Sequence, residues 1–321
     1  MKIYDYNNLK KFYACGDLHG EFDSLFYELK NNLLYDKKKF KENKHPLEIE
    51  EEKRKKDEQE RIEERQILPI NTDILDSFFN DSKLNNSLVI FSGDCGFGFN
   101  KFQYYVDKLS KINEIITETN THILFVRGNH DDPSYFSEEK INFSNIKCIP
   151  DYSIVKVNDN NILCVGGAIS VDRIWRKQQE NVINKYSKSK NRKLYWEDEC
   201  VYLDRNIITF LKNNDITIDG VITHSSPSFA FPSEKTSAIE WFKLDSSLKD
   251  DVKRERSILS ELYIILTENN HNIKYWVHGH FHLSNFKFKF NTLFIALNCD
   301  IKFRNILKLY NDAMDNRENN S

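Results

Sequence analysis

Short apolar runs recur along the chain, and five of them end in a turn that carries Asp, Asn or His. An apolar run of about four to eight residues bounded by turn residues predicts a buried strand. The five runs with their turns read "KFYACGDLHG", "SLVIFSGD", "HILFVRGNHDD", "DGVITHSSPS" and "IKYWVHGHFH". Groups at the carboxyl ends of strands gather along one rim of an open α/β sheet. We therefore expect the five turns to lie together.

The stretches between these runs carry the other signals of an α/β fold. Residues 22–34, 104–116 and 258–266 repeat their apolar positions at close to helical spacing, which predicts three helices. Further strands are predicted by "NIKCI", "YSIVKV" and "NILCVGGAIS", and a closing hairpin by "NFKFKF" and "TLFIALN". Because Phe and Lys alternate in "NFKFKF", this strand is predicted to bury one face.

Two stretches interrupt the alternation of strands and helices. Residues 36–64 are almost devoid of apolar side chains, and their Lys and Arg residues alternate with Glu at spacings that allow i,i+4 pairs. We predict a solvated, charged insertion at about 36–70, with a regulatory or partner-docking arm as the alternative. Residues 172–204 are charged and aromatic, and we expect a second insertion there that lies over the site as a lid. The whole chain, 1–321, is then predicted to form a single domain.

Composition narrows the class of protein. The chain has 321 residues, 40% of them hydrophobic, and a net charge of −3, so it has enough apolar residues for a core and no general attraction to nucleic acid or acidic membranes. A local basic groove for nucleic acid is still compatible with that average. No signal peptide and no membrane-spanning run is apparent. The six cysteines form no CxxC pair, which favours reduced thiols and a cytoplasmic protein.

The polar residues of the five turns have the chemistry of metal ligands. They are Asp17, His19, Asp94, Asn129, His130, His224, His278, His280 and His282. Carboxylate, carboxamide and imidazole donors together suit ions such as Mn, Fe, Ni or Zn. Since there are more donors than one ion takes, they would suffice for two ions bridged by a carboxylate.

Each of these residues also has an ordinary structural reading. The two Asp residues could cap helix N-termini, Asn129 could stabilise a tight turn, and His224 could be a buried core histidine. The three histidines of "VHGHFH" occupy alternate positions, which in a strand would place them on one face. The structural readings explain neither the order of the blocks nor their position at strand ends, so the metal reading is favoured.

The ordered blocks "GDLHG", "SGD", "GNHD", "ITHSSP" and "HGHFH" resemble the calcineurin-like metallophosphoesterase superfamily, from about residue 16 to 298. The resemblance implies a four-layer αββα sandwich of two mixed β-sheets flanked by helices. It implies that one metal ion is bound by Asp17, His19 and His282, a second by Asn129, His224 and His280, and both by Asp94. It also implies that His130 protonates the leaving group or contacts the phosphoryl group, whereas His278 receives no role.

One block departs from the phosphoprotein phosphatase pattern GDxxDRG. In "GDCGFGF", Phe97 and Gly98 stand where that pattern has the Asp that orients the catalytic His and the Arg that binds phosphate. Asp131 and Asp132 are alternative partners for His130. The block is instead similar to the GDFG type of phage and bacterial metallophosphatases, as are "GGAISVDR" and "YWEDE" further along the chain.

The last two motifs supply candidate substrate contacts. Arg173, Arg176 and Trp196 are predicted to bind the substrate as phosphate clamps or as a stacking surface. The alternative is that the arginines form ordinary salt bridges and that the tryptophans at 175 and 196 pack the insertion onto the core.

The sequence thus predicts a phosphoesterase with two divalent metal ions, with Mn favoured over Fe, Ni or Zn. Its substrate is predicted to be a small phosphomonoester, a nucleotide or a phosphodiester, cleaved by a metal-activated water. A serine/threonine protein phosphatase, a nuclease or a non-catalytic scaffold of the same fold are the alternatives. No membrane partner is predicted, nucleic acid is not excluded, and a protein partner is left open.

Overall fold

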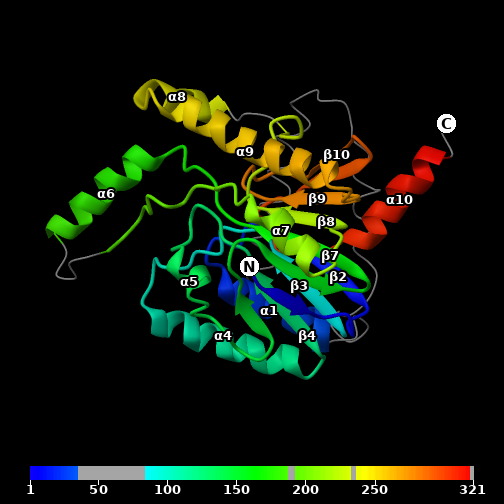
Figure 1. Ribbon diagram of the computed structural model, residues 1–321. Coiled ribbons are helices and arrows are strands. Elements are labelled where there is room, and N and C mark those ends of the chain that lie inside the picture. The colour runs from blue at the N-terminus through cyan, green and yellow to red at the C-terminus, as the bar shows by residue number, and fades with distance from the viewer. Residues whose placement is uncertain (35–83, 187–191, 233–235, 319–321) are drawn as a thin grey trace, which may run out of the picture.

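The computed structural model describes residues 1–34, 84–186, 192–232 and 236–318. Two β-sheets form its centre and helices cover their outer faces (Figure 1). The charged insertion predicted at about 36–70 lies outside the described residues.

The smaller sheet contains the first three metal-ligand turns. Its strand order is β12-β2-β3-β4-β5, with bounds Arg304–Asn305, Lys11–Cys15, Ser87–Phe91, Thr121–Phe125 and Ile146–Cys148. Strands β2 to β5 are parallel, while β12 pairs antiparallel with β2. The turns after β2, β3 and β4 therefore emerge at the same edge.

The larger sheet contains the other two turns. Its strand order is β1-β6-β7-β8-β9-β11-β10, with bounds Ile3–Asp5, Ser153–Val157, Asn160–Val165, Gly220–Thr223, Tyr275–His278, Thr292–Ala296 and Asn285–Lys289. Strands β7, β8, β9 and β11 are parallel, and β6 and β10 pair antiparallel with β7 and β11. Both sheets are thus mixed.

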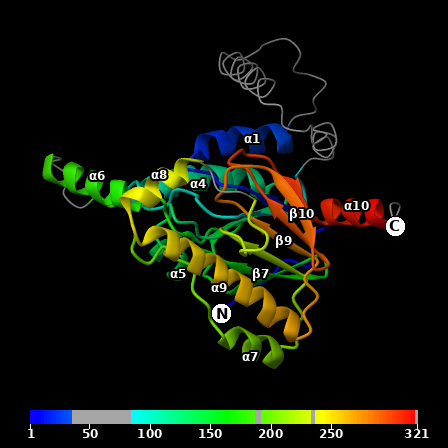
Figure 2. The ribbon, with the colours of Figure 1, turned by 90° about the horizontal axis from the view of Figure 1, so that it is seen from above.

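The helices lie on the two outer faces and at the ends of the sandwich. Their bounds are α1 Phe22–Leu34, α4 Phe102–Thr117, α5 Ser134–Ser137, α6 Arg173–Tyr186, α7 Asn206–Asn213, α8 Thr236–Leu244, α9 Leu248–Glu268 and α10 Ile306–Glu318. Helices α6 and α10 lie at opposite ends of the molecule in both views (Figures 1 and 2). None of the helices in the described ranges combines the length and apolar composition that crossing a bilayer requires.

Alternation along the strands explains the layers. In β2, Tyr13 faces the helices α1 and α4, while Phe12 and Ala14 face the other sheet. In β9, Val277 faces the smaller sheet and Trp276 packs against α9. Each central strand is therefore buried on both faces, as the continuous apolar runs predict. The predicted four-layer sandwich, helix–sheet–sheet–helix, is confirmed.

Two predictions about single elements need correction. The helix predicted at 258–266 is α9, which begins ten residues earlier at Leu248 and includes an amphipathic, charged first half. The buried face predicted for "NFKFKF" is formed only in part: in the edge strand β10, Phe288 packs against the core, whereas Phe286 is 53% exposed. Strand β9 ends at His278, so the rest of "VHGHFH" is the turn that follows the apolar run.

Candidate metal centre

The five turns meet where the carboxyl ends of the two sheets adjoin. Within them, donor atoms of Asp17, His19, Asp94 and His282 all lie within 4.8 Å of one another, and so do those of Asp94, His224 and His280. Asp94 belongs to both groups. The structure therefore brings the predicted Asp and His ligands together as two adjoining sets of donors.

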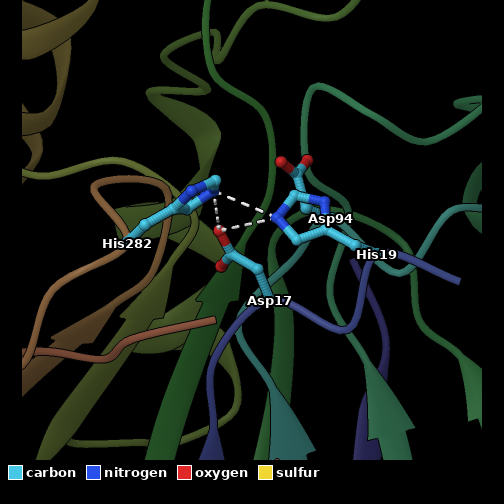
Figure 3. A group of neighbouring side chains, drawn as sticks. All are labelled: Asp17, His19, Asp94 and His282. Atoms are coloured by element: carbon cyan, nitrogen blue, oxygen red, sulfur yellow. Dashed lines mark hydrogen bonds and ion pairs between the residues drawn. The ribbon is translucent and has the colours of Figure 1, made fainter. Parts of the chain in front are cut away.

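The first group surrounds the buried carboxylate of Asp17 (Figure 3). Nε2 of His282 lies 3.2 Å from Oδ2 of Asp17, and Nε2 of His19 lies 3.8 Å from the same oxygen. The two imidazole nitrogens are 3.0 Å apart. Two ring nitrogens and a carboxylate oxygen that point at one another are arranged as ligands of a common cation.

The second group is ordered around His224, which is fully buried. Its Nδ1 lies 2.9 Å from the carbonyl oxygen of Ser92, and this contact directs Nε2 toward Asp94 Oδ1 at 3.2 Å and Asn129 Oδ1 at 3.0 Å. The contact of Nδ1 with a backbone carbonyl fixes the orientation of the ring, and Nε2 can become a metal ligand once a cation displaces its proton. Asn129 thereby joins the Asp94, His224 and His280 group.

Four of the predicted ligands have a left-handed backbone conformation. The φ angles are 48° at His19, 49° at Asp94, 67° at His280 and 50° at His282. Non-glycine residues pay about 1–3 kcal/mol for sparsely populated conformations, which cluster at functional sites. Hydrogen bonds to the ligands offset part of this strain: the His280 N–H donates to Asp17, and the His130 N–H donates to Asp94 at 2.7 Å.

Electrostatics at the centre favours positive charge. Burial opposes ionisation of Asp94, yet His130 and His224 hold the pKa of its carboxyl well below the usual range. Burial would lower the pKa of His224, but Asp94 and Asp17 raise it to about 10. Burial lowers the pKa of His19 and of His280, so both rings keep the lone pair that a ligand needs. The donor set fits divalent cations.

His130 contacts an arginine from the second insertion. Nη2 of Arg176 lies 2.7 Å from Nδ1 of His130, and the guanidinium is held by Asp172 at 2.8 Å and by the Leu194 carbonyl at 3.2 Å. Burial lowers the pKa of His130 to about 4; Asp94 opposes this shift, and Arg176 adds to it. A negatively charged group next to this pair would raise the pKa again, because it stabilises the imidazolium.

The carboxylates suggested as partners of His130 have other functions. Asp131 accepts hydrogen bonds from the N–H groups of Cys95, Gly96, Phe97 and Gly128 at 2.7–3.1 Å, and so it braces the turn after Asp94. Asp132 accepts from the N–H and the hydroxyl of Ser134. The His130 ring instead contacts Arg176, which is 46 positions away in the sequence, and its Nε2 lies 3.9 Å from Oδ2 of Asp94.

The other two predicted substrate contacts lie in different surroundings. Arg173 forms ion pairs with Asp245 at 2.6 Å and Asp251 at 2.8 Å, which anchor α6 to α8 and α9. Trp196 is 3% exposed, and its ring lies 5.2 Å from that of Phe99 in the turn after β3. Of the three candidates, Arg176 is the one whose side chain contacts a predicted site residue.

His278 does not join the two groups of ligands. It is the last residue of β9, buried, with Nδ1 3.3 Å from the carbonyl oxygen of Gly279, and burial lowers its pKa to about 4. It is a neutral histidine packed edge-on against the ring of Phe281. Of the three histidines of the motif, His280 and His282 thus belong to the groups of donor atoms and His278 does not.

Sequence reasoning missed three residues that hold the ligands in place. Ser92 orients His224, Ser170 contacts the Asn129 amide, and Glu199 contacts Ser170. Burial raises the pKa of Glu199 to about 8, while the bonds from Ser170 oppose the rise. Ser170 belongs to "GGAISVDR" and Glu199 to "YWEDE". Those motifs therefore pointed to both residues, but the sequence did not show that the two contact each other and Asn129.

Comparison with known proteins gives a family match. A family model described as "Calcineurin-like phosphoesterase" matches residues 10–284, and no curated protein matches the chain. Among solved structures, a cold-active protein-tyrosine phosphatase of a psychrophilic Shewanella species is 13% identical, with a TM-score of 0.33, over 94% of this chain and 73% of that one. The phosphopantetheinyl hydrolase of Mycobacterium tuberculosis is 12% identical, with a TM-score of 0.33, over 91% of this chain and 90% of that one.

Close packing at Gly128 gives a first test of the centre. A Cβ at Gly128 would lie 2.1 Å from both the N and Oδ1 of Asp94, whereas a Cβ at Gly20 would meet no atom within 4 Å. Gly128→Ala should lower the free energy of unfolding by about 1–3 kcal/mol and weaken Mn²⁺ binding, because Asp94 must shift. Gly20→Ala, which adds only backbone strain at φ +79°, should keep its Mn²⁺ affinity. Urea unfolding and Mn²⁺ titration measure both. Equal Mn²⁺ affinity of the two variants would contradict the geometry.

Proposed function

The chain belongs to the calcineurin-like phosphoesterase family, and from this we propose that it hydrolyses phosphate esters with two divalent metal ions. The observation that carries the proposal is the position of Asp94, whose carboxylate belongs to both groups of donor atoms. A carboxylate with two oxygens can bind two cations at once and set their separation. A single-ion site would not need the second set of donors.

We assign the ligands by group. Asp17, His19 and His282 would hold one ion and Asn129, His224 and His280 the other, with Asp94 between them. The mixed oxygen and nitrogen donors favour Mn²⁺, with Fe, Ni or Zn as further candidates. Two such ions polarise phosphoryl oxygens and lower the pKa of a water to near neutrality. Since Asp17 and Asp94 are the two carboxylates in the set, the loaded centre would keep a net positive charge for an anionic substrate.

His130 and Arg176 are proposed to act on the substrate. The guanidinium, held at its other end by Asp172 and Leu194, presents Nη2 toward the His130 ring. A phosphoryl oxygen that takes the place of this direct contact would accept a hydrogen bond from Arg176 and raise the pKa of His130, which would then give its proton to the leaving oxygen. Arg176 would thus replace the phosphate-binding Arg that "GDCGFGF" lacks.

The proposed substrate is a small phosphomonoester, a nucleotide or a phosphodiester. Support comes from α6, which brings Arg176 to the site, and from Trp196, which packs beside the turn that follows Asp94. We infer that residues 172–186 and 192–204 border the site within a single domain and limit the size of the substrate that enters.

Replacing the shared carboxylate tests the two-metal proposal. Asp94→Asn should abolish Mn²⁺-stimulated hydrolysis of p-nitrophenyl phosphate and its bis ester, because a carboxamide has one oxygen and no charge with which to join two cations. Asp107→Asn, an exposed change on α4, is the matched control and should behave as wild type. Metal content by mass spectrometry accompanies the assay. Full activity and two bound ions in Asp94→Asn would refute the mechanism.

Leaving-group dependence tests the proton donor. His130→Ala should lower kcat for phenyl phosphate by about 10²–10⁴-fold, the usual value of general acid catalysis. The loss should be much smaller for p-nitrophenyl phosphate, whose leaving group departs without a proton, and Mn²⁺ affinity should be nearly unchanged. Steady-state kinetics with both substrates measure the difference. An equal loss for the two esters would show that His130 is not the acid.

The two arginines of α6 form a matched pair. Arg176→Ala should lower kcat/KM by about 10–100-fold through loss of a charged hydrogen bond to phosphate, with Arg176→Lys restoring only part of it. Arg173→Ala should lower the unfolding free energy, since Arg173 binds Asp245 and Asp251, and should leave kcat/KM near wild type. If Arg173→Ala had the larger kinetic effect, Arg176 would not be the phosphate contact.

A further inference from the structure

Asn129 is held by a hydroxyl from the loop that follows β7. Its Nδ2 donates to Oγ of Ser170 at 2.9 Å, and its Oδ1 lies 3.0 Å from Nε2 of His224. The amide nitrogen therefore faces the loop, and the amide oxygen faces the second group of ligands.

The serine is in turn oriented by a carboxyl group. Oγ of Ser170 donates to Oε2 of Glu199 at 2.6 Å, and the N–H of Ser170 donates to Oε1 at 2.8 Å. Two donors from one residue occupy both oxygens of Glu199, so the hydroxyl hydrogen points at Glu199 and an Oγ lone pair is left to accept from Asn129. The backbone of Glu199 is also fixed, because its carbonyl accepts from Arg127 at 2.8 Å and from Ala168 at 3.1 Å.

We propose that Ser170 and Glu199 are positioning residues that fix the Asn129 carboxamide with its oxygen toward the second metal ion. The two ends of a carboxamide have nearly the same shape, but only the oxygen binds a cation, while the –NH₂ end repels it. Asn129, Ser170 and Glu199 are 2%, 1% and 0% exposed, so solvent does not compete for these bonds. Partners of this kind set ligand orientation, and their removal typically lowers metal affinity by about 10–100-fold.

A second buried carboxylate on the same loop provides the matched control. Glu255 of α9 accepts from the N–H of Ile169 and from the hydroxyl of Ser225. It tethers the same loop as Glu199 does, one residue earlier, but neither of these two bonds leads to the Asn129 amide. Glu255→Ala therefore reports what loosening the loop does to metal binding when the Asn129 carboxamide keeps its partner.

The proposal rests on the two-metal function. The experiment tests the binding of two ions and the orientation of Asn129 separately. Calorimetric titration of metal-free protein with Mn²⁺ measures both ions without any activity assay. Wild type should bind two ions. Ser170→Ala should bind one ion about 10–100-fold more weakly and the other unchanged, and Glu199→Ala should do likewise, since no acceptor would remain to orient the Ser170 hydroxyl. Glu255→Ala should lower the unfolding free energy yet keep both affinities.

A double-mutant cycle distinguishes orientation from loss of structure. In an Asn129→Ala background, Ser170→Ala should cause no further loss of affinity, because no carboxamide remains to orient. An equal loss in both backgrounds, or wild-type affinity in Ser170→Ala, would overturn the proposal while leaving two-metal binding intact. Failure of wild type to bind two ions would overturn the proposed function itself.

Discussion

The rest of the structure depends on two carboxylates, Asp17 and Asp94, that are buried side by side with no exposure to water. Charged groups in such a place are unfavourable unless positive charge compensates them. The surrounding imidazoles supply part of it, since Asp94 and Asp17 raise the pKa of His224 despite its burial. The same field is what a pair of divalent cations would neutralise more completely. The left-handed backbone conformations at His19, Asp94, His280 and His282 are strained, and they occur where the side chains gather around these two carboxylates.

The sandwich architecture is what brings these donor residues together. The smaller sheet presents Asp17, Asp94 and Asn129 at the carboxyl ends of adjacent parallel strands, and the larger sheet presents His224 and His280 in the same way. Neither sheet carries a complete set of donors. The apolar layer between the sheets, with side chains such as Ile90 and Val277, fixes the position of one sheet relative to the other. The geometry of the centre therefore depends on how this layer packs.

The segment between β7 and α7 completes the centre from outside. Its first loop contributes Ser170, its helix α6 contributes Arg176, and the irregular stretch before α7 contributes Glu199. These three side chains act on Asn129 and His130, neighbours in one turn. In the proposed function, Arg176 takes the place of the phosphate-binding Arg that the "GDCGFGF" block lacks. Arg173 anchors this part of the chain to α8 and α9.

Apolar runs and the residues that follow them are local properties, so the sequence was enough to predict the described strands other than β1 and β12, together with the donor type at the end of each metal-ligand strand. It also determined the four-layer fold through the family resemblance. The family resemblance also implied that Asp94 is shared and that His278 has no role at the site. The contact of His130 with Arg176 rather than Asp131, and that of Asn129 with Ser170, became visible only in the folded chain. Such contacts join residues 41 to 263 positions apart, as with Asn129–Ser170 and His19–His282. Their geometry follows from how two sheets and a distant helix pack, which no local pattern of residues encodes.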